Sequence, residues 1–238
     1  MIEGEINMII SGLQKLTLLD FPGYIACTIF TRGCNLRCPF CQNKGLAVPE
    51  YFDEKEIIPV QNIIDFLKMR KSRLQGVCIT GGEPTLQTDL MDFIRQIKDM
   101  GYKVKLDTNG TNPDMIKTLL DENLLDYIAM DIKNDLSRYT LTAGAAVNQD
   151  DILKSIDIIK TAGIEYEFRT TVVKELHDKQ SFRNIAEMIK HVKNYSLQYY
   201  EETENVINPI YHTPSDDEMS DYCHIMQDAA DCVIIKGR

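Results

Sequence analysis

Three cysteines stand close enough together in the sequence to bind one metal centre. They are Cys34, Cys38 and Cys41, in the segment Cys-Asn-Leu-Arg-Cys-Pro-Phe-Cys. Thiolates are soft ligands that suit zinc and iron–sulfur clusters. A structural zinc site needs a fourth ligand, and the nearest histidine, His177, is distant in sequence. Three cysteines on a [4Fe–4S] cluster leave one iron open for a substrate or cofactor, so we interpret the segment as a catalytic cluster site.

Glycine and polar residues follow each of the next three apolar runs. They are Gly81, Gly82 and Glu83 after the first, Asp107 and Thr108 after the second, and Asp131 and Lys133 after the third. The two glycines remove side-chain bulk so that backbone groups can approach a ligand, and Glu83 can accept a hydrogen bond from a cationic amine. Strand ends of a parallel sheet meet at one edge, where such folds place their active sites. We therefore expect these residues on the same rim as the cysteines.

Apolar runs rich in branched residues alternate with segments that have helical periodicity. This alternation predicts repeated strand–helix units and a mainly parallel sheet. Glycines at 101 and 163 mark two helix ends. The predicted strands are Tyr24–Phe30, Gly76–Thr80, Tyr102–Asp107, Leu125–Asp131, Ile164–Val173 and Ser196–Tyr200. The predicted fold class is α/β.

Nothing in the sequence resembles a linker or a repeat, so residues 1–238 are predicted to form a single domain. Within residues 201–238 we expect a surface loop over Glu201–Pro214, a helix over Ser215–Ala230 and a short strand over Cys232–Ile235. Residues 1–7, which precede Met8, are a candidate N-terminal extension.

Charge and hydropathy exclude several classes of partner. The chain has 26 basic and 36 acidic residues, a net charge of −10, which does not suit nucleic-acid binding. The longest apolar run is too short to span a membrane, and the N-terminus lacks the features of a signal peptide. Seven cysteines, an odd number, without such a signal indicate reduced thiols. We expect a cytoplasmic protein.

The cysteine segment resembles the signature of the radical S-adenosylmethionine enzymes, with Phe40 as its aromatic residue, and the Gly-Gly-Glu-Pro segment resembles their companion motif. Further segments resemble the activating proteins of anaerobic ribonucleoside-triphosphate reductases, which are glycyl-radical-enzyme activases. These segments are 13–23, 33–43, 105–113, 129–133 and 166–173. The resemblance covers about residues 8–200 and implies a partial (β/α)6 barrel, with parallel strands and helices outside.

The resemblance also implies a role for each site residue. Cys34, Cys38 and Cys41 would bind a single [4Fe–4S] cluster whose open iron chelates S-adenosylmethionine. Phe40 would lie against the adenine, and Glu83, with Gly81 and Gly82, would receive the methionyl amine. The expected carboxylate and ribose contacts are Lys133 and Arg169, and the expected ligands of a monovalent cation are Asp107, Thr108 and Asp131. His212 is a weaker candidate, with a solvent-exposed loop histidine as the alternative.

The chemistry implied is reductive cleavage of S-adenosylmethionine, followed by abstraction of hydrogen from a glycine Cα of a partner protein. The expected partners are a glycyl radical enzyme and an electron donor such as flavodoxin or ferredoxin, without nucleic acid or membrane. No acid–base pair is needed for this reaction, and Cys27, Cys78, Cys223 and Cys232 are predicted to be ordinary buried residues.

Several alternatives stay open. The target could be pyruvate formate-lyase or another glycyl radical enzyme in place of the reductase. The substrate could be a small molecule, as in the deazaguanine-forming synthase. A non-catalytic iron–sulfur carrier or a zinc-stabilised module would leave Gly81, Gly82, Glu83 and Lys133 unexplained. One departure from the family is Gln42, which stands where a histidine is common.

Overall fold

The computed structural model describes residues 6–203 and 205–237. Its strands follow one another in an open sheet in chain order, from β1 to β8. β1 pairs antiparallel with β2, whereas β2 with β3, β3 with β4, β6 with β7 and β7 with β8 pair in parallel. The strands are β1 Ile10–Thr17, β2 Ala26–Thr31, β3 Gly76–Gly81, β4 Lys103–Thr108, β5 Tyr127–Asp131, β6 Glu165–Val172, β7 Val192–Tyr199 and β8 Ala230–Lys236.

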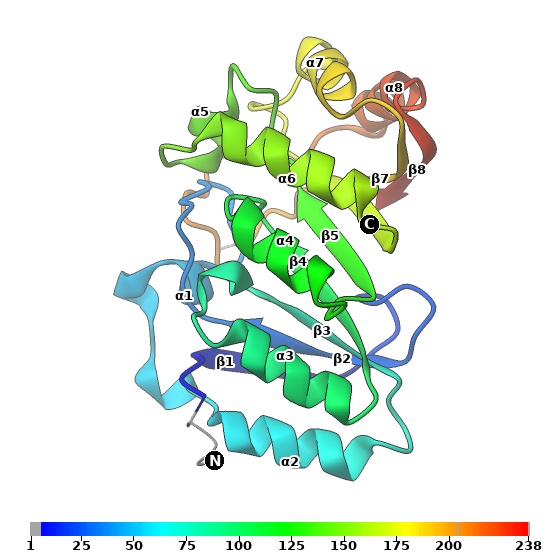
Figure 1. Cartoon of the computed structure of the whole chain (residues 1–238). Helices are drawn as coiled ribbons and strands as arrows, with labels where there is room; N and C mark the ends of the chain where they lie inside the picture. The colour runs from blue at the N-terminus through cyan, green and yellow to red at the C-terminus, as the bar shows by residue number, and fades with distance from the viewer. Residues whose placement is uncertain (1–5, 204, 238) are drawn as a thin grey trace. The chain divides into compact units, whose positions relative to one another are not determined.

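Helices connect the parallel strands, as the alternating sequence pattern predicts (Figure 1). The α-helices are α1 Lys44–Ala47, α2 Val60–Arg70, α3 Leu90–Asp99, α4 Pro113–Asp121, α5 Tyr139–Ala143, α6 Gln149–Thr161, α7 Lys179–Ile189 and α8 Asp216–Met226. Short 3-10 helices cover Pro49–Tyr51, Glu54–Glu56 and Pro84–Leu86. The α/β class and the mainly parallel sheet are confirmed, and an open sheet is consistent with a partial barrel.

The chain forms two compact units, and each is assembled from separate stretches of sequence. The first contains residues 1–35, 45–108 and 114–128, and the second contains residues 36–44, 109–113 and 129–238. The single-domain organisation stays a prediction. The N-terminal extension predicted over residues 1–7 lies mostly outside the described residues.

In the first unit, most residues of β2 and β3 are buried, as are the apolar faces of α2 and α3. Figure 1 shows both helices on the same side of these strands. The amphipathic face of α3 consists of Leu90, Phe93, Ile94 and Ile97, all of which are buried. Gly101, with φ +79°, follows the last turn of α3 in the left-handed conformation, so the predicted glycine stop is confirmed.

In the second unit, β6, β7 and β8 pair in parallel, and α7 packs on α8. Side chain to backbone caps fix the first turns of both helices. Asp178 accepts from the Ser181 N–H at the start of α7, and Ser215 accepts from the Glu218 N–H at the start of α8. Helix α8 spans Asp216–Met226, where the sequence predicts a helix over Ser215–Ala230, and β8 spans Ala230–Lys236, where it predicts a strand over Cys232–Ile235.

Among the described residues, every helix is too short or too polar to cross a lipid bilayer.

Candidate active site

The segment with the three clustered cysteines begins after β2 and passes from the first unit into the second. Cys34 belongs to the first unit, whereas Cys38 and Cys41 belong to the second. The Cys41 N–H donates to the Cys38 carbonyl at 2.9 Å, so the last two cysteines lie on one tight turn. Cys38 is buried, and the other two are partly exposed. None of the seven cysteines, all of them within the described residues, forms a disulfide.

Backbone contacts within the second unit hold the middle of this segment. The Arg37 N–H donates to the Ala143 carbonyl at 2.9 Å, and the Asn208 N–H donates to the Pro39 carbonyl at 2.7 Å. Gly144 ends α5 with φ +63°, and a Cβ there would lie 2.0 Å from the Arg37 carbonyl oxygen. Any larger residue at 144 would therefore push the cysteine segment away. The sequence offered no local signal for this contact.

Phe40 is buried and meets Tyr200 edge to face, with ring centroids 6.3 Å apart. Its ring is therefore fixed by protein packing on one side. The predicted adenine contact stays a prediction.

Gly81 and Gly82 let the end of β3 pack closely on the backbone that leads to Cys34. A Cβ on Gly82 would lie 2.0 Å from the Gly33 carbonyl oxygen, and one on Gly81 would lie 2.3 Å from the Thr31 oxygen. The Gly82 and Glu83 N–H groups donate to the carbonyls of Thr31 and Gly33 at 2.9 and 2.7 Å. In this unit the two glycines make room for the chain itself, and the contact with a ligand stays a prediction.

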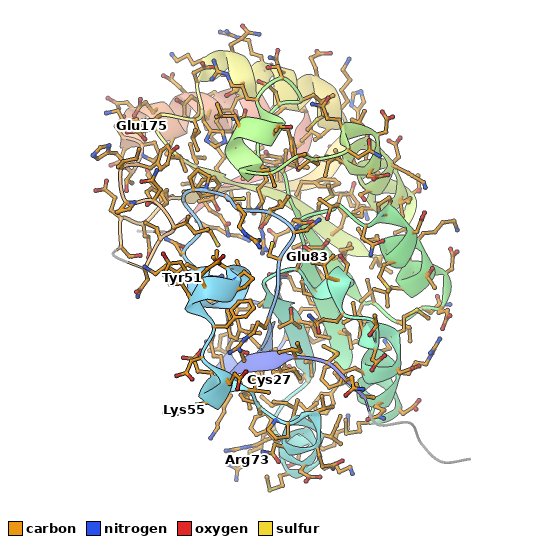
Figure 2. The ribbon with its side chains drawn as sticks, turned by 90° about the vertical axis from the view of Figure 1, so that its left-hand side faces the viewer. Cys27, Tyr51, Lys55, Arg73, Glu83 and Glu175 are labelled. Carbon is orange, nitrogen blue, oxygen red and sulfur yellow. The ribbon has the colours of Figure 1, made fainter. Side chains whose placement is uncertain are left out.

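Glu83 is buried just beyond the end of β3 (Figure 2). Its Oε1 accepts hydrogen bonds from the Thr85 N–H at 3.1 Å, the Thr85 hydroxyl at 2.6 Å and the Thr108 hydroxyl at 2.7 Å. These three donors fix the orientation of the carboxylate. Thr108, a predicted cation ligand, acts here as a hydrogen-bond donor to Glu83.

Asp107 lies at the end of β4 beside a buried lysine that the sequence analysis did not single out. The Lys105 ammonium donates to Asp107 Oδ1, and the Cys78 sulfur lies 3.8 Å from the same oxygen. Lys105 is almost completely buried, so the carboxylate compensates its charge. Alternation along the strand puts Lys105 and Asp107 on one face.

Asp131, Lys133 and Arg169 form an ion cluster at the ends of β5 and β6. Asp131 accepts from Arg169 Nε at 2.5 Å and from Lys133 Nζ at 3.0 Å. Burial would raise the pKa of Asp131, but the positive charges of Arg169 and Lys133 outweigh it and hold that pKa well below its usual range. The set of one carboxylate and two cations carries one net positive charge.

His177 is buried and supports Lys133 from behind. The Val173 N–H donates to His177 Nδ1 at 3.0 Å, and His177 Nε2 lies 2.9 Å from the Lys133 carbonyl oxygen. Because a carbonyl can only accept, Nε2 carries the proton. Burial lowers the pKa of His177 and keeps the ring neutral. No motif in the sequence indicates this role of His177.

His212 is exposed and pairs with Glu175, which lies at the outside of the second unit (Figure 2). Its Nδ1 lies 2.6 Å from Glu175 Oε1. These surroundings are those of a solvent-exposed loop histidine, the alternative to a role near the cofactor. Gln42, on the cysteine segment, donates from Nε2 to the Glu201 carbonyl at 3.0 Å.

The four remaining cysteines are not all buried. Cys27 and Cys78 lie inside strands and are fully buried, as predicted, and burial raises the pKa of the Cys27 thiol to about 12. Cys223 on α8 is half-buried. Cys232 is exposed, and its prediction was wrong because β8 ends the sheet and leaves most of its side chains uncovered.

The described residues contain no group of three or more histidine, cysteine, aspartate or glutamate side chains placed to hold a single metal ion. A [4Fe–4S] cluster takes one thiolate on each of three irons, so its ligands stand further apart than those of one ion. Three thiols on a segment held by its backbone fit that donor set.

Comparison with known proteins agrees with these features. The model of the radical SAM superfamily matches residues 28–198. The chain is 34% identical over 206 residues to a Methanocaldococcus jannaschii protein named "Putative glycyl-radical enzyme activating enzyme", covering 81% of this chain and 80% of that protein. It is 28% identical over 192 residues to a pyruvate formate-lyase-activating enzyme of Clostridium pasteurianum, covering 78% and 77%.

A solved structure shows the same fold. The crystal structure of Streptococcus suis SuiB bound to S-adenosylmethionine superposes with a TM-score of 0.65 at 18% identity, covering 86% of this chain and 48% of that one. The family match extends from β2 to β7 and includes the three clustered cysteines and the Gly-Gly-Glu segment. This chain belongs to the radical SAM superfamily.

Proposed function

We propose that this chain is an activating enzyme that generates a glycyl radical on an anaerobic ribonucleoside-triphosphate reductase. Membership of the superfamily implies a [4Fe–4S] cluster and S-adenosylmethionine. When bound, the cluster would supply one electron for the reductive cleavage of S-adenosylmethionine, and this chemistry would remove a hydrogen atom from a glycine Cα of the partner. The similarity to a named glycyl-radical enzyme activating enzyme over four fifths of the chain is the observation that carries the activase assignment.

The three clustered cysteines would hold the cluster. Cys34, Cys38 and Cys41 are the thiols of the signature segment, and the backbone contacts at Arg37 and Pro39 keep the segment in one conformation. A preformed ligand loop loses less conformational entropy when the cluster binds than a flexible one does. The buried Cys27 is a poor ligand candidate by contrast, because its raised pKa disfavours the thiolate.

Two oppositely charged sets of side chains would receive the amino-acid part of S-adenosylmethionine. Glu83, oriented by Thr85 and Thr108, offers a carboxylate to the cationic amine. Lys133 and Arg169 offer cationic groups to the carboxylate, and both are held in place by Asp131. The hydrogen-bonded groups are already oriented before the ligand arrives, which reduces the cost of binding.

The expected monovalent cation stays a prediction. Asp107 already pairs with the Lys105 ammonium, and Asp131 with two cationic side chains. A bound cation would therefore compete with these ammonium and guanidinium groups.

Five segments that resemble reductase-activating proteins favour the reductase as the target. They include the opening Leu-Leu-Asp-Phe-Pro-Gly at 18–23 and Lys-Leu-Asp-Thr-Asn-Gly at 105–110. The similarity to a pyruvate formate-lyase-activating enzyme supports pyruvate formate-lyase as the second candidate. Flavodoxin or ferredoxin is the proposed electron donor.

An electron paramagnetic resonance (EPR) experiment separates these targets. Reconstituted, reduced protein is mixed anaerobically with S-adenosylmethionine and either the reductase or the lyase. We expect a glycyl doublet with the reductase, because the hydrogen left on a glycyl Cα splits the radical signal. A doublet with the lyase alone would overturn the target assignment. If neither protein gives a doublet and 5′-deoxyadenosine forms only when a small-molecule substrate is added, the result would support the alternative of a small-molecule enzyme.

A further inference from the structure

Glu167 on β6 is a buried carboxylate that no sequence motif indicates. Its Oε2 accepts hydrogen bonds from the Ser196 hydroxyl at 2.7 Å and from Lys236 Nζ at 2.6 Å. Burial would raise the pKa of Glu167, but the positive charges of Arg169 and Lys236 and these hydrogen bonds hold it below its usual range. The carboxylate is therefore ionised at neutral pH, and a buried charge of this kind needs cations close to it.

The Glu167 carboxylate lies beside Arg169, a proposed cofactor contact. Residues two apart on a strand share a face, so Glu167 and Arg169 project from the same side of β6. Ser196 is the residue of β7 that pairs with Arg169 in the parallel register, and neighbouring strands lie about 4.8 Å apart. Because the Ser196 hydroxyl binds the Glu167 carboxylate, that carboxylate has turned along the strand to the level of Arg169. All of these residues belong to the second unit.

Two carboxylates approach Arg169 from the two neighbouring strands of β6. Asp131, on β5, accepts from Arg169 Nε at 2.5 Å. Glu167 is held on the β7 side, where Ser196 and Lys236 bind it. Lys236 belongs to β8, so its side chain reaches over β7 to the carboxylate. Lys236 is thereby placed to keep Glu167 apart from Arg169.

Arg169 is a second cation that Glu167 could bind. Without the Lys236 ammonium, the buried carboxylate would still have the Arg169 guanidinium beside it, and opposite charges attract strongly in a buried site. The single Nε–H of Arg169 is donated to Asp131, so S-adenosylmethionine would contact the Nη atoms. A Glu167 carboxylate turned towards Arg169 would compete for these atoms and would repel the carboxylate of the methionyl group.

We propose that Lys236 is a positioning residue, which holds the Glu167 carboxylate at β7 and so prevents it from competing with S-adenosylmethionine for Arg169. The inference rests on the proposed function, since it takes Arg169 as a cofactor contact. It gives the C-terminal strand β8 a part in cofactor binding, although the resemblance to the activases covers only about residues 8–200. Lys236 acts on Arg169 through Glu167 and does not itself touch the cofactor.

The test is a double-mutant cycle in which the Kd for S-adenosylmethionine is measured by anaerobic calorimetry on reconstituted, unreduced protein. Lys236→Met should raise this Kd about tenfold, because Glu167 then competes for Arg169. Adding Glu167→Gln to Lys236→Met removes the competing charge and should restore the Kd to within about twofold of the wild-type value. The matched control is Lys179→Met, which breaks an exposed ion pair with Asp221 in the same unit and should leave the Kd unchanged.

Urea unfolding of the cluster-free proteins separates this role from a merely structural one. Lys236→Met and the double variant both lose the ion pair, so both should be less stable than the wild type, yet only the double variant should bind S-adenosylmethionine normally.

An unchanged Kd in Lys236→Met, or a raised Kd that Glu167→Gln does not restore, would overturn the inference. If Lys236→Met does not fold, Ser196→Ala, which removes the other donor to Glu167 with little change in volume, should raise the Kd in the same direction, and an unchanged value would overturn the inference. A wild-type protein that takes up a cluster but does not bind S-adenosylmethionine would instead contradict the proposed function.

Discussion

Replacing Cys38 with alanine should abolish both the cluster absorbance and the cleavage of S-adenosylmethionine. Cys38 is the middle cysteine of the signature segment and the buried one of the three. Loss of one of three protein ligands leaves two irons without a protein thiolate. The chain then no longer binds the cluster stably. The measurements are iron and sulfide content after anaerobic reconstitution, the visible absorbance, and 5′-deoxyadenosine formed after reduction.

Cys223→Ala is the matched control for this prediction. Cys223 is a half-buried thiol on α8, away from the signature segment in sequence, and its pKa is raised by burial. The control should keep the wild-type iron content and activity. A loaded and active Cys38→Ala protein would refute the assignment of the cluster ligands, as would a Cys223→Ala protein that loses its cluster.

Asp131→Asn should lower the free energy of unfolding by about 2 kcal/mol, because it leaves Lys133 and Arg169 together without their shared carboxylate. The figure is below that for a fully buried pair, since the Asp131 side chain is 29% exposed. The exposed pair of Lys117 and Asp121 provides the control, and Asp121→Asn should change stability by less than about 0.5 kcal/mol. Urea unfolding of the cluster-free proteins at pH 7 measures both values.

The pH dependence gives the Asp131 prediction a second test. The pKa of Asp131 is lower in the folded chain than in the unfolded one, where it is about 3.9. Its contribution is therefore fully present above that value and is lost as the pH falls towards the folded pKa. The stability gap between wild type and Asp131→Asn should stay constant from pH 7 to 5 and narrow below about pH 4. A gap that narrows already between pH 7 and 5 would be inconsistent with this cause.

The bounds of strands that are buried on both faces could be predicted from the sequence. Those of the more exposed strands could be predicted less well. The strands β2 to β6 are mostly buried, and their predicted bounds differ from the observed ones by two residues or fewer. Strand β1 is not predicted, because its central residues are half-exposed or exposed and it pairs antiparallel at the sheet edge. The predicted start of β7 is four residues late, because Lys193 and Asn194 interrupt the apolar pattern.

Residue types in the site could be predicted, but the partners that orient them could not. The motifs identify Glu83 and Lys133, yet the Thr108 hydroxyl that orients Glu83 and the ring of His177 behind Lys133 come from other strands and loops. Gly144 is a similar case, since its contact is with Arg37. Such contacts depend on how distant segments pack, and local periodicity carries no information about them.

The most direct test of the central claim follows the hydrogen atom. The partner reductase is prepared with glycine deuterated at Cα and mixed anaerobically with this protein, reduced, and S-adenosylmethionine. We predict deuterium in the 5′-deoxyadenosine formed and a glycyl EPR signal whose doublet splitting collapses, because the remaining Cα substituent is deuterium. Cleavage that yields 5′-deoxyadenosine without deuterium, and no glycyl signal, would contradict the proposal that this chain transfers its radical to a protein glycine.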